Sequence, residues 1–565
     1  MKKNKPAPEA SKPPKPPAAR SAVQPWWPLP ALLAAALAVY LPAMNGPFLF
    51  DDLSLPILSG QPPGEWTFYA RRIIRAVFNL SLLADYHLWG LNPAPYHWLN
   101  WVLHAANGFL AFLILRGFKV SHRLSVLCAG IFWLHPLQTE AVSYIASRSE
   151  GLSVLFSYSA LLLFVARDRQ ARLSWPRTMG ILLLMGLGAL SKESAVAMAG
   201  VFVIIDLLEG RLRRLLSNWK LYLPMAAGGA AAAYHFIQIA SREGSAGFGL
   251  QGVKPLDYLW TQFQCIPIYL RFYVLPWGQN LDHGFPVAKA PLDFLSWVGL
   301  AFLVMLTGLA WRYRAAYPLL LPGLLTFLVL LTPTSSIVPI ADTLVERRMY
   351  LPFIGLLLAT AALLERMAWN AARSAGAVAI LALLAGLTGV RNQIYTSSIA
   401  MWQDSIKKNP KNARAHFQLG YAFYREGQCA EANKYYEAAA ALNKPDYELL
   451  VDWALSLDCA GSPQAAVEKL RAATALKKDS HAWATLGMVY GKSGRPAEAL
   501  DALNQALAIN RHDANALAYR GNVYLVGGRT AEAIADFEAA LSISPANAIA
   551  AQGLAAARAA QSPAK

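Results

Sequence analysis

Long apolar runs recur in this chain from residue 26 to residue 391, and they restrict its fold more than any other feature. A bilayer core is about 30 Å thick, so a helix needs roughly 20 mainly apolar residues to cross it. Apolar residues make up 55% of the chain and charged residues only 15%, unlike an average soluble protein. The pattern predicts an all-α protein whose residues 26–395 form a multi-spanning membrane domain.

About eleven of these runs are predicted to cross the membrane. They lie at residues 28–44, 98–116, 124–137, 151–166, 178–190, 193–208, 220–239, 295–311, 317–332, 349–364 and 375–391. Short basic connections separate some of them, and the positive-inside rule places such connections in the cytoplasm. These basic connections lie at 116–123, 167–177, 209–220, 312–314 and 365–373.

The apolar run at 258–275 is equivocal. The basic connections all fall on one side only if this run is a re-entrant or interfacial helix. If it crosses the membrane instead, every later segment changes side. With eleven crossings, the C-terminal region lies opposite the N-terminus and outside the cytoplasm.

The N-terminal 25 residues combine Pro, Ala and Lys with little to bury, which predicts a disordered basic cytoplasmic tail, 1–25. The net charge of +17 could indicate a nucleic-acid partner. However, Lys and Arg fall in short clusters between apolar runs, so membrane topology explains the charge better and no nucleic acid is expected. A cleaved signal peptide is the rival for the first span, but Ala43-Met44-Asn45 is a poor cleavage site.

Ionisable residues gather at the span ends on the predicted outer side, in loops 45–97, 135–151, 191–194, 240–294 and 332–352. Each such residue at membrane depth costs roughly 2.5–3.5 kcal/mol on insertion scales. A single one is commonly a structural ion pair, whereas a group on one face indicates a functional site. The group consists of Asp51, Asp52, Glu140, Arg148, Lys192, Glu193, Glu346, Arg347 and Arg348.

A polar stripe occupies the second predicted span. Asn100, His104 and Asn107 are spaced to share one face of a helix. They either join neighbouring helices by hydrogen bonds or line a cavity beneath the outer loops.

Residues 412–560 change character and contain an internal repeat. Copies start near 413, 447, 480 and 514, and small residues recur in register at Gly420, Ala454, Gly487 and Gly521. A spacing of about 34 residues with small residues in register is the tetratricopeptide (TPR) pattern. It predicts an array of four to five repeats, ending in a capping helix at 548–558, after a linker at 396–411. Such arrays bind peptides or proteins.

The chain has four cysteines. Cys128 and Cys265 lie in apolar runs and are expected to be packing residues. Cys429 opens the second helix of one repeat and Cys459 closes the first helix of the next, so the two are expected to be neighbours. If the array is outside the cytoplasm they are a candidate disulfide; otherwise they are two small buried residues.

Several motifs in order resemble one family. They are Asp51-Asp52, then RAVFNLSLLADYHLWGLNPAPYHWLNWVLH (75–104), HPLQTEAVSYIASRSEGL (135–152), LSKE (190–193) and ERRMYLPFIG (346–355), followed by the repeats. The set resembles the TMTC-type protein O-mannosyltransferases, within the GT-C class of membrane glycosyltransferases. Departures are Arg75-Ala76 for the family's Arg-Pro, Gln138 in place of the His of His-Thr-Glu, and the small number of repeats. The chain itself looks like a bacterial relative of this family, and this resemblance implies a multi-pass protein of the bacterial inner membrane.

The resemblance implies a reaction and roles for the site residues. A sugar, with mannose as the expected one, passes from a polyprenyl-phosphate carrier to Ser or Thr hydroxyls of exported proteins bound by the array. Asp51 is implied as the general base, with Asp52 orienting the acceptor or sharing the proton. Arg347, Arg148 and Lys192 are implied to neutralise the phosphate, and Arg348 could substitute for its neighbour. Glu140, Glu193 and Glu346 are assigned to the sugar or to these cations.

Other interpretations stay open from the sequence. No cofactor is firmly indicated, but Asp51 and Asp52 could hold a divalent metal or cap a helix. The acceptor could instead be a glycan or a lipid. The chain could also be a non-catalytic membrane scaffold, although a scaffold has no use for the insertion cost of the charged residues.

Overall fold

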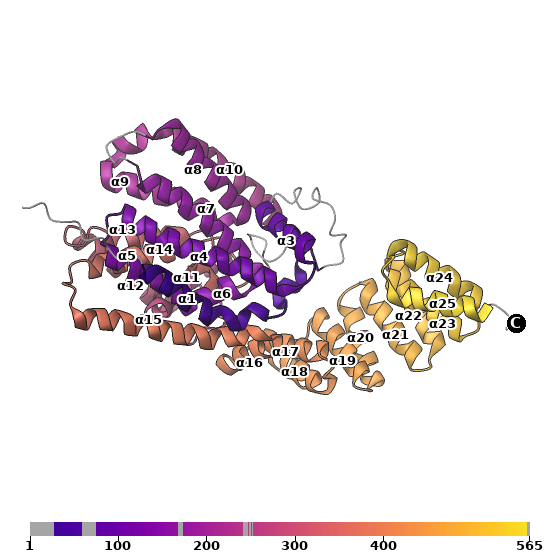
Figure 1. The fold of residues 1–565 in the computed structure, drawn as a ribbon. Helices are drawn as coiled ribbons and strands as arrows, with labels where there is room; N and C mark the ends of the chain where they lie inside the picture. Colours follow the sequence, from indigo (N-terminus) through magenta and orange to yellow (C-terminus); the bar gives the residue numbers. More distant parts are fainter. Residues whose placement is uncertain are drawn as a thin grey trace, which may run out of the picture.

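The computed structural model describes residues 27–58, 75–167, 173–240, 247, 250 and 252–561. In this part of the chain a helical domain is followed by a solenoid of paired helices, so the all-α prediction is confirmed (Figure 1). The predicted tail, 1–25, lies outside the described residues, as do parts of the loops 45–97 and 240–294.

Each predicted span coincides with a helix. These helices are α1 (Pro28–Tyr40), α4 (Pro93–Gly117), α5 (His122–Leu134), α7 (Arg148–Val165), α8 (Trp175–Ser191), α9 (Met198–Ser217), α10 (Trp219–Ala240), α12 (Phe294–Arg312), α13 (Leu320–Leu331), α14 (Phe353–Leu364) and α15 (Ala371–Asn392). Five segments of the described chain are long and apolar enough to cross a membrane: Pro28–Asn45, Pro93–Gly117, Ile145–Val165, Phe294–Arg312 and Ala371–Thr396. Helices α5, α13 and α14 are apolar but shorter.

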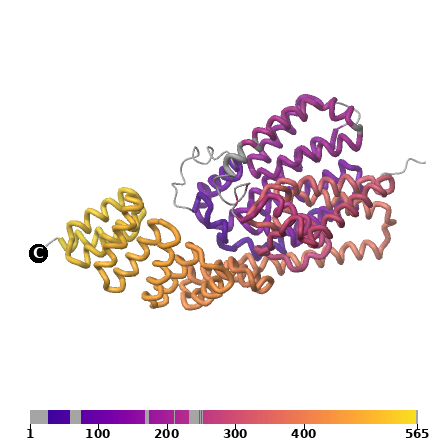
Figure 2. The backbone as a smooth tube through the Cα atoms, turned by 180° about the vertical axis from the view of Figure 1, so that it is seen from behind, coloured from indigo at the N-terminus to yellow at the C-terminus, as the bar shows by residue number. Residues whose placement is uncertain are grey.

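Helices α1 and α15 run in parallel, which fixes the polarity of the domain. Asn392 Nδ2 donates a hydrogen bond to the Val39 carbonyl at 2.8 Å, at the C-terminal ends of both helices. One turn or more earlier, Leu32 and Leu381 both lie against Gly130. The first helix therefore starts at one end of the domain, and the solenoid leaves from the other end (Figures 1 and 2).

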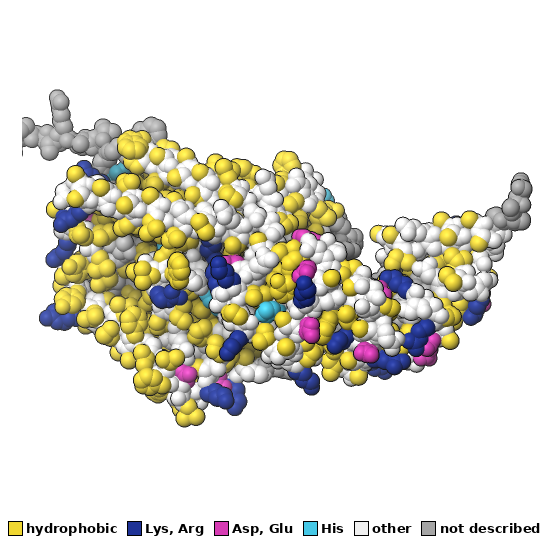
Figure 3. All heavy atoms as spheres, turned by 90° about the horizontal axis from the view of Figure 1, so that it is seen from below, with side chains coloured by type: hydrophobic (Ala, Val, Ile, Leu, Met, Phe, Trp, Pro, Cys, Tyr) yellow, Lys and Arg dark blue, Asp and Glu magenta, His cyan; other side chains and the backbone are white. Residues whose placement is uncertain are grey.

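The two ends of the helical domain differ in charge. At the end away from the solenoid, the Ser121 amide donates to Glu365 at 3.3 Å and Arg366 lies over the Tyr317 ring. This end thus gathers three of the basic connections. On the face in Figure 3, hydrophobic side chains are spread over much of the domain, and Lys and Arg lie at the edge away from the solenoid and also at places across the face.

The equivocal run forms α11 (Pro255–Val274). Near its start, the Tyr258 hydroxyl donates to the Thr334 carbonyl at 2.6 Å, and near its end the Tyr269 hydroxyl accepts from the Val345 amide at 3.0 Å. Both partners belong to the segment between α13 and α14. In the last turn of α11, the Tyr273 hydroxyl lies 2.7 Å from Thr360 Oγ1 of α14. The interfacial placement of α11 stays a prediction.

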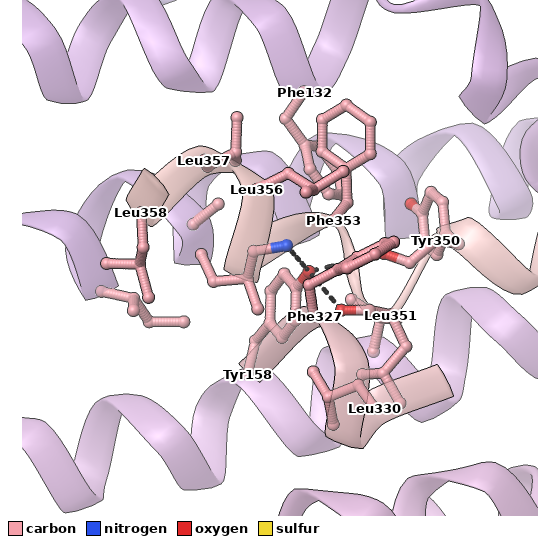
Figure 4. Close-up of a cluster of buried hydrophobic side chains, with 14 of the residues drawn as sticks. Phe132, Tyr158, Phe327, Leu330, Tyr350, Leu351, Phe353, Leu356, Leu357 and Leu358 are labelled. Carbon is pink, nitrogen blue, oxygen red and sulfur yellow. Dashed lines mark hydrogen bonds between the residues drawn. The ribbon is translucent and has the colours of Figure 1, made fainter. Parts of the chain in front are cut away.

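Buried aromatic residues anchor the segment before α14 (Figure 4). The Tyr158 hydroxyl donates to the Leu351 carbonyl at 3.0 Å and accepts from the Ile354 amide at 3.2 Å. Phe132 and Phe353 pack against each other beside it, with their ring centroids 5.7 Å apart. The segment that follows Arg347 and Arg348 is therefore held in the core of the domain.

Short helical turns and one longer helix occupy the end of the domain nearest the solenoid. They are η1 (Leu41–Asn45), η2 (Phe50–Ser54), α3 (Ala76–Trp89), η3 (Pro136–Gln138), α6 (Thr139–Ser143), η4 (Ile145–Ser147), η5 (Glu193–Ala197), η6 (Glu346–Met349) and η7 (Gln393–Thr396). All but α3 are short turns of 3-10 or α-helix.

The solenoid begins its repeats at the residues the sequence predicts. Its helices are α17 (Ala413–Arg425), α18 (Cys429–Leu442), α19 (Tyr447–Cys459), α20 (Pro463–Leu476), α21 (Ser480–Lys492), α22 (Pro496–Ile509), α23 (Ala514–Val526), α24 (Thr530–Ile543) and α25 (Ala548–Gln561). The glycines allow close packing, since a Cβ on Gly521 would lie 2.7 Å from Phe537. A disulfide joins Cys429 and Cys459, whose Cα atoms are 6.0 Å apart.

Residues 398–408, expected to be part of a linker, instead form helix α16 (Ser398–Lys408). The Ser397 side chain caps its first turn by accepting from the Ala400 amide at 3.1 Å. Met401 and Trp402 are buried on one face, 0% and 1% exposed. The helix forms because this face packs against the domain, a contact that the local sequence does not reveal.

Candidate active site

The short turns at the solenoid end bring the predicted site residues together. Turn η2 carries Asp51 and Asp52, and α6 carries Glu140. Turns η5 and η6 supply Glu193 and Arg347. These elements come from four separate parts of the chain.

The two adjacent aspartates have different environments. Asp52 is fully buried; its Oδ2 accepts from the Leu49 amide at 2.9 Å and its Oδ1 from the Ala146 amide at 2.6 Å. Burial raises the pKa of Asp52 to about 8, with a smaller contribution from Asp51, while the backbone amides oppose the shift. Burial thus favours the protonated form of Asp52, and the two amide contacts tie η2 to η4.

Asp51 lies at the surface of the same turn and is half-buried. Its amide donates to the Tyr144 hydroxyl at 2.6 Å, and its carbonyl accepts from Ser54 Oγ at 2.7 Å. Within the described parts of the chain, its carboxylate makes no hydrogen bond or ion pair. Phe50, just before it, has φ of 43°, a region that non-glycine residues rarely adopt. Such strained positions tend to occur at functional sites.

Arg347 carries a charge that interacts with that of the Asp51 carboxylate. Its amide donates to Glu140 Oε2 at 2.9 Å and its Nη1 to Glu140 Oε1 at 2.5 Å. Burial lowers the pKa of Arg347, but Glu140, Tyr144 and Asp51 raise it by more. The guanidinium thus stays charged in the field of Asp51, and 24% of its side chain remains exposed.

Two further ion pairs extend the cluster. Lys192 pairs with Glu150, and Arg75 binds Glu193 through Nε at 3.1 Å and Nη2 at 2.7 Å. Lys192 and Arg75 also lie within the electrostatic range of Arg347.

The sequence interpretation missed Arg75 and Glu150 as members of the site. Arg75 adopts φ of 60°, which gives the site a second strained residue. Its sequence signal is its place at the start of the motif at 75–104, one of those that resemble the TMTC-type family.

Arg148 and Arg348 lie apart from the exposed cluster. Arg148 is fully buried, where it pairs with Asp85 at 2.6 Å and donates to Asn100 Oδ1 at 3.0 Å. Arg348 donates to the carbonyls of Asp342 at 2.5 Å and Thr343 at 3.2 Å. Both guanidinium groups have their donors engaged by the protein, which fits an anchoring role better than contact with a phosphate.

Glu346 points away from its neighbour Arg347. It is buried and accepts from the Asn280 amide at 2.5 Å, Gln279 Nε2 at 2.9 Å and Arg391 Nη2 at 3.2 Å. His283 Nε2 lies 3.0 Å from its Oε1. Glu346 therefore ties η6 to α15 and to the segment after α11.

The polar stripe on α4 is buried between helices. Asn100 Nδ2 donates to the Tyr144 carbonyl at 3.2 Å, and Asn107 Nδ2 to the Gly151 carbonyl at 3.0 Å. His104 Nδ1 lies 2.9 Å from the Tyr350 hydroxyl. These contacts match the prediction that the stripe joins neighbouring elements by hydrogen bonds.

Metal binding by the two aspartates stays a prediction. Each carboxylate oxygen of Asp52 accepts one backbone amide, and the Asp51 carboxylate lies at the surface of the same turn. In the described parts of the chain, no group of three His, Cys, Asp or Glu residues could hold a metal ion.

Comparisons with known proteins found matches to the repeats and, among curated relatives, over most of the chain. The tetratricopeptide repeat family matches residues 383–447 and 484–548. Protein O-mannosyl-transferase F38B6.6 of Caenorhabditis elegans is 24% identical over 454 residues, covering 74% of this chain and 63% of its own length. Mouse TMTC3 is 21% identical over 74% of this chain and 51% of its own length. Human TMTC2 is 30% identical over 31% of this chain and 23% of its own length.

Among solved structures, the TPR protein YrrB matches 30% of this chain and 86% of its own at 20% identity, with a TM-score of 0.25, too low to support an argument. The fold and the repeats define a multi-pass helical membrane protein that carries a TPR array. Within that class, the chain is a relative of the TMTC-type protein O-mannosyltransferases, and it spans between half and two thirds of the first two relatives.

Proposed function

We propose that the protein is a membrane glycosyltransferase of the GT-C type that moves mannose from a polyprenyl-phosphate carrier to Ser or Thr hydroxyls of exported proteins. The observation that carries this proposal is the Asp51 carboxylate, half-exposed and without a partner among the described residues, in the field of the Arg347 cation. The names of the relatives support the sugar and the type of acceptor.

The geometry is suited to a direct displacement. Asp51 accepts the proton of the acceptor hydroxyl as the hydroxyl oxygen attacks the anomeric carbon. The bond from that carbon to the phosphate oxygen breaks, and Arg347 stabilises the charge that develops on the phosphate. Lys192 and Arg75 add positive charge beside it. One displacement inverts the anomeric carbon, so a β-linked carrier sugar gives an α-linked product.

The reaction is assigned to the non-cytoplasmic side. Basic connections gather at the end of the domain away from the array, which the positive-inside rule places in the cytoplasm. The disulfide in the array also suits an oxidising compartment. The host membrane is expected to be a bacterial inner membrane. Alkaline phosphatase fused to the C-terminus is expected to be active, and an inactive fusion would reverse this topology.

The test of the activity is a reconstituted transfer assay. Purified protein in liposomes receives radiolabelled polyprenyl-phosphate mannose and an extract of exported proteins. Wild type is expected to label protein. The transfer rate of Asp51→Asn is expected to be at least about 100-fold lower, because the variant lacks its general base. Asp501→Asn, an exposed aspartate of the array, is the matched control. Unchanged transfer by Asp51→Asn excludes its role as base, and label found only in lipid or glycan excludes a protein acceptor.

A further inference from the structure

Helix α16 contacts the turn that carries Asp51. The Phe50 and Trp402 rings meet edge to face, with their centroids 5.0 Å apart. Trp402 is 1% exposed, so the contact is buried. Phe50 directly precedes Asp51 and holds the left-handed backbone conformation of the turn. A residue in such a conformation persists only where its surroundings stabilise it.

The turn and the first repeat share one hydrophobic cluster. Leu49, which lies just before Phe50 in the chain, is buried in it, as is Tyr144, whose hydroxyl accepts from the Asp51 amide. The solenoid side of the cluster includes Met401, Trp402, Ala415, Leu419 and Phe423. Two domains joined by a flexible linker would each have a separate hydrophobic core. Here, in contrast, the core of the first repeat continues into the helical domain as far as Leu49.

The same helix also reaches the segment that carries Arg347. Ser405 Oγ donates to Asn280 Oδ1 at 2.6 Å, and the Asn280 amide donates to Glu346 Oε1 at 2.5 Å. Ser405 and Glu346 are fully buried. The chain of contacts from α16 therefore ends on the residue next to Arg347.

Helix α17 adds a clasp on the outside of this contact. Arg414 pairs with Asp282 at 2.6 Å and with Asp342 at 2.7 Å. Asn412 Nδ2 donates to the Asp282 carbonyl at 3.2 Å. Two segments of the helical domain are thus held to the first repeat, which limits movement of α16 relative to both turns.

We propose that α16 positions the general base and the phosphate-binding cation together, with Trp402 acting through Phe50 and Ser405 acting through Asn280 and Glu346. In both turns one residue is anchored to α16 and the next one faces the site. The array is then a structural part of the active site. The roles of Asp51 and Arg347 rest on the function proposed above, whereas the ordering of the two turns by α16 does not. Displacement of a reacting group by about 1 Å can cost 100-fold in rate, so modest loosening is sufficient to matter.

The first test measures order without activity. Hydrogen exchange of the full-length protein in detergent is followed by mass spectrometry in wild type, Trp402→Ala, Trp402→Phe and Trp483→Ala. Trp483 is a partly buried tryptophan of α21 that packs against the clusters of the later repeats, away from the cluster of Trp402, and serves as the control. Trp402→Ala is expected to speed exchange in residues 48–58 by about tenfold or more, Trp402→Phe to restore most of the protection, and Trp483→Ala to leave it unchanged. Unchanged exchange there in Trp402→Ala overturns the proposal.

A second variant covers the case in which Trp402→Ala unfolds the whole array. Ser405→Ala removes one hydrogen bond and little volume, and it is expected to speed exchange in residues 344–350 while α21 to α24 stay protected. Unchanged exchange in that segment overturns the second arm of the proposal.

The transfer assay then separates positioning from binding. In Trp402→Ala the kcat is expected to fall about 100-fold, with the KM for polyprenyl-phosphate mannose nearly unchanged, and Trp402→Phe is expected to recover most of the rate. A normal kcat in a variant whose turn has loosened overturns the catalytic consequence. If wild type transfers no mannose while exchange responds as expected, the proposed function fails and the positioning of the turns by α16 stands.

Discussion

The TPR array and the candidate active site are both helical, but their contacts have different ranges along the sequence. In the array, Arg520 binds Asp536 only 16 residues away, and the disulfide closes a separation of 30. In the site, Arg347 and Glu140 are 207 residues apart, and Asp52 and Ala146 are 94 apart. A repeat therefore specifies its own neighbours, whereas the site depends on how distant turns meet. Substitutions in the two regions are expected to have different effects.

The largest difference is expected for Arg347→Ala. Loss of the cation that we propose to meet the developing phosphate charge is expected to lower kcat/KM by about 100- to 1,000-fold. The melting of the array is expected to stay as in wild type, since Arg347 lies outside it. Transfer kinetics together with differential scanning calorimetry check this. Arg558→Ala removes an exposed ion pair at the far end of the array and is the control; equal rates in the two variants would contradict the assignment of Arg347.

The disulfide tests the opposite case, a local contact without catalytic consequence. Replacing Cys429 and Cys459 by Ser frees a loop of this size and is expected to cost the array about 3 kcal/mol. The rate of transfer to a short soluble peptide is expected to change little. Thermal unfolding with and without reductant measures the effect, because reductant should destabilise wild type and leave the double variant unaffected. An equal response of both proteins would contradict the disulfide.

The pH dependence of folding stability tests the buried role of Asp52 in the site. Burial raises its folded pKa to about 8, far above its ordinary value, so the folded protein holds this proton more tightly than the unfolded chain. The resulting stability is fully present below pH of about 4 and is lost as the pH rises through about 8. The melting temperature of wild type minus that of Asp52→Asn is therefore expected to fall between pH 6 and pH 8.5. A constant difference over that range would show that Asp52 is ionised throughout.

The smallest effect is expected for exposed pairs within the array. Lys434 and Glu431 form an i,i+3 pair at 2.6 Å with side chains 68% and 46% exposed. Lys434→Ala is expected to change stability by no more than about 0.5 kcal/mol. Urea unfolding monitored by circular dichroism is precise enough to detect a larger change, which would indicate that the pair belongs to a network.

The helices and repeat starts were predictable because their signals are local. Apolar runs identified each helix of the predicted spans, and small residues in register identified the starts at 413, 447, 480 and 514. Helix α16 was missed because its apolar face is short and its partners, such as Phe50 and Asn280, lie in two distant outer loops. Asp85 and His283 were also missed, since nothing beside them in the sequence marks them as partners of Arg148 and Glu346.

Apolar runs and the internal repeat are enough to predict an all-α membrane protein with a TPR array, and they mark the segments that could bear a site. The roles of the charged residues follow from the folded chain: Asp51 and Arg347 remain partly exposed, whereas Asp52, Arg148, Glu346 and Arg348 hold the turns in place. Periodicity along the sequence records only which face of a helix is buried. The partner of a buried charge is chosen by segments that meet only in the folded chain.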